Sequence, residues 1–143
     1  MKKGEKLVIV GCSGAGGPAA MMAKKLMPDV DVTIIREEKY FIVRWSLPHV
    51  VAGLVTEMSI VNPDQKLIDQ GINVILGKAT GIDIKQKLIH VSEGSSVQYD
   101  KMILATGASP FIPPIEGSDL EGVFTLRGLE DAETIKQFLK DKD

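Results

Sequence analysis

The chain has 143 residues, 44% of them hydrophobic, and a formal net charge of −2. That length supports one packed core, so a single domain is expected, and the near-neutral, interspersed charge gives no attraction for nucleic acid or a membrane surface. A single cysteine excludes an internal disulfide or redox cysteine pair. With no charged-then-apolar leader and no membrane-length apolar run, the sequence predicts a soluble cytoplasmic protein.

The first predicted unit is a βαβ segment. Residues 7–10 form a continuous apolar run, typical of a strand buried on both faces of a parallel sheet, and residues 31–35 form a second β-branched run. Between them, residues 18–27 are rich in helix formers, and Pro18 fits only in a first helical turn. The order of strand, helix and strand favours a parallel α/β sheet.

A glycine-rich turn joins the first strand to this helix. Gly11 permits a sharp turn, and Gly16 permits close packing of the helix on the strand. Ser13 stands where a second glycine is usual, but its hydroxyl can still face a phosphate oxygen. With Gly14 and Ala15, the turn can aim the N–H groups of a helix N-terminus at a pyrophosphate. The pattern therefore predicts a dinucleotide site.

The end of the second strand is less regular. An acidic residue that binds a ribose is expected there, but Arg36 holds the place and Glu37 and Glu38 follow it. Either Glu37 binds the ribose hydroxyls after a small change of register, or Arg36 contacts a phosphate or the adenine. A solvated charged turn is an equal alternative, and NADP binding through Arg36 is a weaker one.

The middle of the chain predicts a short helix and a set of strands. Asn62 is expected to cap a helix that ends before Gly71. Residues 73–76 then form a third parallel strand. The alternating apolar pattern from 77 to 99, broken at two polar turns, predicts a small antiparallel meander.

Near the end of the chain, residues 101–105 return to the buried-strand pattern. A helix is expected to begin near Leu129, because Ala132, Ile135 and Leu139 form an apolar stripe. Taken together, the elements predict an α/β fold: a Rossmann-like three-layer domain with a parallel sheet and an accessory antiparallel β-meander.

Several motifs in this order carry a family resemblance. They are the glycine turn, the Leu-Pro-His segment 47–49, the Ala-Thr-Gly-Ala-Ser-Pro motif at 105–110, and the segment 122–132. The chain resembles, over its whole length, the N-terminal FAD-binding portion of the pyridine-nucleotide-disulfide oxidoreductases. Within that family it is most similar to the branch of NADH oxidases, NADH peroxidases and coenzyme A disulfide reductases. The motif at 105–110 is the most specific part of the resemblance.

The resemblance implies an FAD site in which the glycine turn holds the pyrophosphate. The backbone of Ala79 and Thr80 would meet the adenine, and Ala105, Thr106 and Gly107 would pass beside the cofactor. A β-carbon on Gly107 is expected to collide with the ligand or with a neighbouring strand. NAD(P)H would be the electron donor in a full-length protein. No metal site is predicted, and no catalytic residue is assigned.

Trp45 departs from the family pattern, because it stands where relatives in that branch carry a redox-active cysteine. Tryptophan forms no thiolate, sulfenic acid or mixed disulfide, so electron transfer through FAD to a small acceptor such as oxygen or quinone would lack a cysteine intermediate. Residues 44–49 would lie along the flavin ring, although Trp45 as core filler and His49 as a capped loop residue are the plainer alternatives. Cys12 is expected to be a packing residue.

Family members continue into an NAD-binding domain and an interface domain, so residues 1–143 are expected to be a partial FAD-binding domain. The parent protein is expected to be an FAD-dependent NAD(P)H oxidoreductase, and this chain alone would not be catalytically competent. An incomplete sheet would expose an edge, which predicts a homo-oligomer or a complementary chain. The alternative is a non-catalytic nucleotide-binding or partner-binding module.

Overall fold

A computed structural model describes residues 1–140 and divides the chain into two compact units. Unit 1 comprises Met1–Phe41 and Asn62–Gly107, and unit 2 comprises Ile42–Val61 and the chain from Ala108 onward. The chain passes between the units at two short paired strands, β3 (Phe41–Ile42) and β4 (Val61–Asn62).

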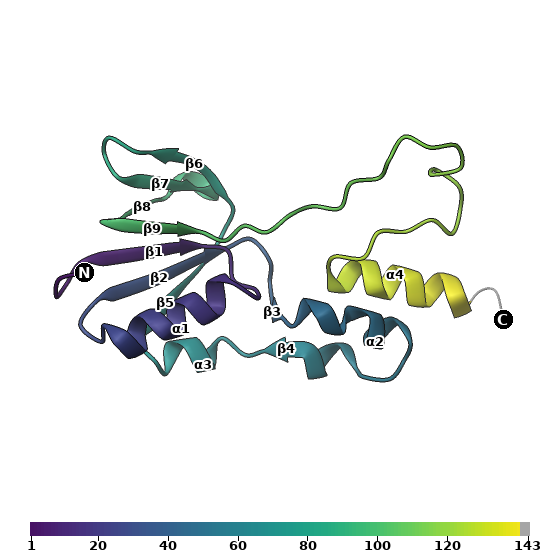
Figure 1. Ribbon diagram of the computed structural model, residues 1–143, viewed down its shortest axis with the longest axis horizontal. Helices are drawn as coiled ribbons and strands as arrows, with labels where there is room; N and C mark the ends of the chain where they lie inside the picture. Colours follow the sequence, from purple (N-terminus) through teal and green to yellow (C-terminus); the bar gives the residue numbers. More distant parts are fainter. Residues whose placement is uncertain (141–143) are drawn as a thin grey trace. The chain divides into compact units, whose positions relative to one another are not determined.

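Unit 1 is built on a four-stranded parallel sheet, shown in Figure 1. Its strands are β1 (Lys6–Val10), β2 (Asp31–Arg36), β5 (Ile72–Leu76) and β9 (Lys101–Leu104), in the order β5-β2-β1-β9. All three pairings are parallel, which confirms the predicted sheet. The carboxyl ends of the four strands therefore meet at one edge of the sheet.

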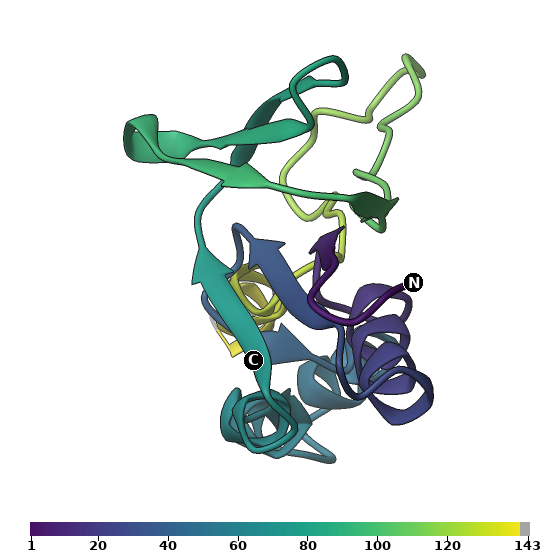
Figure 2. The same cartoon turned by 90° about the vertical axis from the view of Figure 1, so that its left-hand side faces the viewer.

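The two faces of this sheet are covered by different kinds of structure (Figures 1 and 2). On one face pack α1 (Gly16–Leu26) and α3 (Gln65–Ile68). On the other lies an antiparallel meander of β6 (Ala79–Asp83), β7 (Leu88–Val91) and β8 (Ser96–Gln98), with the 3-10 turn η3 (Ser92–Gly94) after β7. The predicted three-layer α/β architecture is confirmed.

Alternation along β1 explains how one strand serves both layers. Leu7 and Ile9 join the core beneath the helices, whereas Val8 and Val10 join the core beneath the meander. Successive side chains of a strand point to opposite faces, so a strand buried on both sides must be apolar at every position. That requirement is why the run at 7–10 is continuous rather than alternating.

Two sequence expectations about local structure are wrong. Asn62 does not cap a helix: it lies in β4. Asp64 holds the N-cap position of α3 with helical φ and ψ and forms no side-chain cap bond; its carboxylate binds Arg36. Gly71 does end this turn, with φ +71°. Strand β9 is not buried on both faces, since Leu104 is 59% exposed. Within residues 1–140, β9 pairs only with β1 and forms an edge of the sheet.

Unit 2 contains two packed helices, α2 (Leu47–Val51) and α4 (Leu129–Lys140), with the 3-10 turns η1 (Arg44–Ser46) and η2 (Glu57–Ile60). Its core consists of buried apolar side chains, chiefly Leu47, Val50, Ile60 and Ala132. The predicted C-terminal helix is confirmed. The Asp131 carboxylate accepts bonds from the backbone N–H groups of Arg127 and Gly128, at 2.7 and 2.8 Å, which fixes the chain as it enters α4.

An ion pair between Glu57 and Lys136 joins η2 to α4 and makes unit 2 sensitive to acid. The hydrogen bond from Lys136 lowers the pKa of Glu57 below its ordinary value of 4.5. A depressed carboxyl pKa stabilises the fold above the unfolded-state value, and this contribution is lost as pH falls through the folded-state value. We expect Glu57→Gln to destabilise the chain at about pH 7 and to have a smaller effect at about pH 3, measured by urea unfolding.

Glu133→Gln is the matched control, because Glu133 is an exposed acid on the same helix as Lys136. It should change the urea midpoint little at either pH. An equal loss from Glu57→Gln at both pH values would contradict the ion-pair interpretation.

Candidate functional site

The candidate site lies at the carboxyl edge of the parallel sheet, where the glycine turn and the Ala-Thr-Gly segment meet. The Gly11 N–H donates to Ile35 O at 2.7 Å, and the Ala105 N–H donates to Val10 O at 2.8 Å. Gly11 has φ +103°, and a β-carbon there would overlap the carbonyl of Ala105. Two segments more than ninety residues apart are thus in direct backbone contact, which requires glycine at position 11.

The N-terminus of α1 follows an exposed turn, although its first two residues are buried. Ala15 is its N-cap residue and forms no side-chain cap bond, and the first turn holds no acidic residue. Gly14 and Ala15 are exposed, and Gly16 packs so closely that a β-carbon would overlap Gly11 O. Of the first three residues of α1, Pro18 has no N–H and the Gly17 N–H donates to Ser13 O at 3.3 Å, so the partial positive charge of this helix end is offered chiefly by the N–H of Gly16. This end of α1 can therefore receive an anion.

Arg36 does not belong to a solvated turn. It is 3% exposed, and its Nη2 donates to Asp64 Oδ2 at 2.5 Å. Its Nε and Nη1 are buried and find no acceptor among residues 1–140. The solvated-turn interpretation is wrong for Arg36, because its guanidinium is enclosed in unit 1. A buried arginine already paired with a carboxylate is poorly placed to take a 2′-phosphate, which disfavours the NADP alternative.

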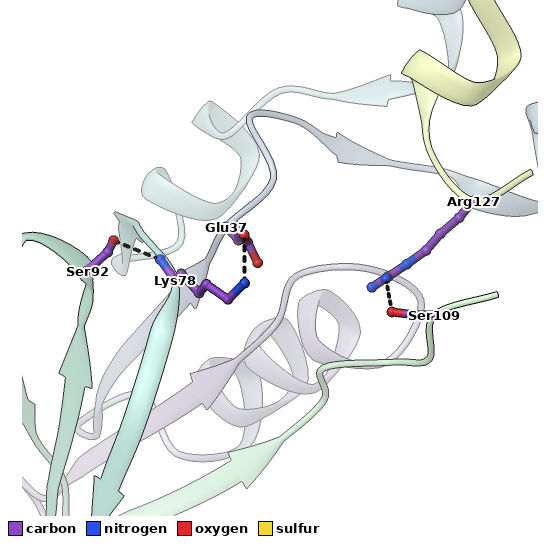
Figure 3. Close-up of polar contacts among 5 residues, drawn as sticks. All are labelled: Glu37, Lys78, Ser92, Ser109 and Arg127. Atoms are coloured by element: carbon purple, nitrogen blue, oxygen red, sulfur yellow. Dashed lines mark hydrogen bonds and ion pairs between the residues drawn. The ribbon is translucent and has the colours of Figure 1, made fainter. Parts of the chain in front are cut away.

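Glu37 and Glu38, in contrast, are exposed. Glu37 Oε1 lies 3.4 Å from Lys78 Nζ, so the residues that follow the ends of β2 and β5 form an ion pair (Figure 3). Ala79 and Thr80 come next in the chain, at the start of β6. The structure thus places the predicted ribose ligand and the predicted adenine contacts at the same edge as the glycine turn.

Gly107 has φ +70°, a conformation that side chains with a β-carbon rarely adopt. Among residues 1–140, no atom beyond its two chain neighbours lies within 4 Å of a β-carbon built there, so the expected collision with a neighbouring strand is wrong. Glycine is favoured at this position by the backbone conformation. Thr106 beside it is exposed.

Cys12 is buried in the core beneath the helices. Burial raises the pKa of its thiol to about 11, against the opposing effect of the nearby Arg36 charge. The thiol is therefore protonated at neutral pH, which makes it a poor nucleophile. These features agree with the predicted packing role.

Within unit 2, Trp45 is presented to solvent. It lies in η1 and is 72% exposed, so the interpretation of Trp45 as core filler is wrong. Its neighbour Arg44 donates to Arg127 O at 2.7 Å. Arg127 Nη1 in turn donates to Ser109 Oγ at 2.6 Å, as Figure 3 shows. These bonds hold η1 against the segment that leads into α4. His49 is also exposed.

Comparison with known proteins decides the family. Residues 5–143 match the family model described as pyridine nucleotide-disulphide oxidoreductase. The chain belongs to this family. The resemblance noted from its motifs is therefore confirmed.

Individual members of this oxidoreductase family are similar to the chain over nearly its whole length. The NADH oxidase of Methanocaldococcus jannaschii is 32% identical over 95% of the chain, and the NAD(P)H coenzyme A polysulfide/persulfide reductase of Pyrococcus horikoshii is 34% identical over 98%. A solved NAD-dependent persulfide reductase from A. fulgidus superimposes with a TM-score of 0.86, at 31% identity, over 95% of this chain and 28% of that one. The chain spans about a third of the length of the curated relatives it matches, 32% in both cases.

The sequence did not indicate two polar residues near the carboxyl edge of the sheet. No sequence pattern assigned a role in the site to Asp64 or to Lys78. A signal for Lys78 existed: it follows the third parallel strand, as Glu37 follows the second, and the two charges are opposite. No sequence pattern pairs Asp64 with Arg36.

For the part of the chain that the structure describes, no helix is long and apolar enough to cross a membrane. No group of three or more histidine, cysteine, aspartate or glutamate residues arranged to hold a metal ion is found there.

Proposed function

We propose that this chain is the FAD-binding portion of an NAD(P)H-dependent flavoprotein oxidoreductase that transfers electrons without a redox cysteine. The observation that carries the proposal is the contact between the glycine turn and Ala105, beside an uncapped helix N-terminus. Parallel α/β sheets bind nucleotides at the carboxyl ends of their strands. The predicted binding residues of unit 1 all belong to segments at that edge.

The residues fit the cofactor. The turn formed by Gly11, Ser13, Gly14, Ala15 and Gly16 would hold the pyrophosphate, because a helix N-terminus with no acid in its first turn favours a dianion. The pyrophosphate would lie against backbone N–H groups rather than against lysine or arginine side chains. Its placement would then depend on the backbone conformation at Gly11.

The adenosine half would extend toward the ends of β2 and β5. Glu37 is exposed there, and its carboxylate would accept hydrogen bonds from the two ribose hydroxyls. The backbone of Ala79 and Thr80 would border the adenine. Arg36 would contribute its buried positive charge, which already acts to lower the pKa of the nearby Cys12 thiol.

On the other side of the turn, Ala105, Thr106 and Gly107 would border the remainder of the cofactor. When bound, the flavin supplies two-electron redox chemistry. The chain's own contribution is to bind the cofactor and orient it. NAD(P)H would donate the electrons in a protein of the relatives' full length, and the nicotinamide site would lie outside this chain.

The absence of a sulfur intermediate follows from two side chains. Trp45, where relatives in the family's NADH oxidase branch place a redox cysteine, has no thiol chemistry. Cys12 is buried, and its thiol has a pKa of about 11. Neither can store an electron pair as a disulfide or sulfenic acid at neutral pH.

An anaerobic dithionite titration of the FAD-loaded chain tests this function. We expect the chain to retain FAD through gel filtration and to take up one electron pair per flavin. Cys12→Ser should bind FAD and titrate in the same way. Uptake of a second pair that is lost in Cys12→Ser would overturn the cysteine-free mechanism, and failure to retain FAD would overturn the cofactor assignment.

A further inference from the structure

Hydrogen bonds fix the backbone on both sides of the ion pair between Glu37 and Lys78. The Gly77 N–H donates to Arg36 O at 2.8 Å. Arg36 precedes Glu37 and Gly77 precedes Lys78, so this bond holds the backbones of the two charged residues side by side. Lys78 is then held by Ser92 through a reciprocal pair: its N–H donates to Ser92 Oγ at 3.1 Å, and the Ser92 N–H donates to Lys78 O at 2.8 Å. Lys78 therefore projects from a fixed stretch of backbone just before β6 (Figure 3).

The ion pair itself is exposed and uses one carboxylate oxygen. Lys78 Nζ lies 3.4 Å from Glu37 Oε1, and the two side chains are 63% and 62% exposed. A glutamate at the exposed end of a strand has several rotamers open to it, and binding a ligand requires one of them. A lysine on a fixed backbone favours the rotamer in which Oε1 faces Nζ. Oε2 is then available to a further donor.

We propose that Lys78 is a positioning residue for the ribose-binding carboxylate of Glu37, and that it thereby tunes recognition of the adenosine ribose hydroxyls. This inference rests on the proposed function, because it assumes that the adenosine half of the cofactor binds at this edge. Lys78 touches Glu37 rather than the ligand. Its effect must therefore depend on the hydroxyl groups that Glu37 binds.

That dependence separates positioning from simple attraction. A lysine near a pyrophosphate raises the affinity of any adenine nucleotide by its charge, whether or not the ribose hydroxyls are present. A lysine that positions Glu37 raises the affinity only of nucleotides that carry those hydroxyls. ADP and 2′-deoxy-ADP share the base and the pyrophosphate and differ in one hydroxyl, so their affinity ratio reports the positioning effect.

The experiment measures the dissociation constants of ADP and 2′-deoxy-ADP by calorimetry for the full chain and three variants. We expect the wild type to prefer ADP about 10-fold, and Lys78→Met to reduce that preference to about 2-fold. Lys78→Arg, which keeps the charge, should retain most of it. Lys85→Met, which removes an exposed lysine from the turn between β6 and β7, should leave the ratio unchanged. Urea midpoints confirm that each variant is folded.

An unchanged ratio in Lys78→Met, whether both affinities fall together or neither falls, would overturn the inference and leave the proposed function intact. Failure of the wild-type chain to bind either nucleotide would instead overturn the proposed function, and the inference with it. A ratio that falls in Lys78→Met and is rescued in Lys78→Arg would support both.

Discussion

Replacing Ala15 with aspartate is expected to lower the affinity of the chain for FAD about 100-fold while leaving its fold intact, which equals about 2.7 kcal/mol of binding free energy. Ala15 is the N-cap residue of α1, where it forms no side-chain bond. Aspartate would place a negative charge at the positive end of α1, so the cofactor-free chain should keep its stability. Its carboxylate would repel the pyrophosphate. Equilibrium dialysis measures the affinity, and urea unfolding measures the stability.

Ala15→Asn is the matched control. Asparagine has nearly the same shape as aspartate but carries no charge, so it should leave the stability nearly unchanged and weaken FAD binding less than aspartate. The difference between the two variants isolates the repulsion between the carboxylate and the pyrophosphate. Equal FAD affinity in Ala15→Asp and the wild type would show that the phosphates do not bind at this end of α1.

Asp64→Asn is expected to destabilise the chain by about 2–3 kcal/mol. The substitution keeps the shape of the side chain and leaves the guanidinium of Arg36, only 3% exposed, without its counter-charge. Removing one partner of a buried ion pair is costly because the remaining charge stays in a medium of low dielectric constant. The Asp64 side chain is 34% exposed, which places the expected loss at the lower end for such pairs. Urea unfolding measures it.

Two further variants test the cause of that loss. Glu37→Gln removes one member of the exposed ion pair with Lys78 and should cost less than about 1 kcal/mol. Arg36→Met combined with Asp64→Asn removes the buried charge and should recover part of the stability. If Asp64→Asn costs no more than Glu37→Gln, the guanidinium of Arg36 is better solvated than its burial indicates.

The contrast between Arg36 and Glu37 clarifies the irregular end of β2. Adjacent residues there have opposite environments: Arg36 turns into the core and Glu37 stays exposed. Alternate residues of a strand face opposite sides, so a change of one position exchanges buried for exposed. The exposed acid is Glu37, one position beyond Arg36, and its binding of the ribose hydroxyls stays a prediction.

Local patterns in the sequence determined most of unit 1. The apolar run at 7–10, the glycine turn and the β-branched run at 31–35 predict β1, α1 and β2 because each depends on residues close together in the chain. The meander and α4 were predictable from alternation and from an apolar stripe for the same reason. The meeting of the glycine turn with the Ala-Thr-Gly segment was also predictable, since parallel strands bring their carboxyl ends to one edge.

Tertiary structure decided the features that depend on which residues become neighbours. The burial of Arg36 depends on Asp64, twenty-eight positions away, which no local pattern in the chain indicates. Strand β9 has the apolar composition of a central strand but lies at an edge, because composition records what a strand can bury and not what covers it. The exposure of Trp45 and the ion pair between Glu37 and Lys78 likewise arise from long-range packing, which no local pattern contains.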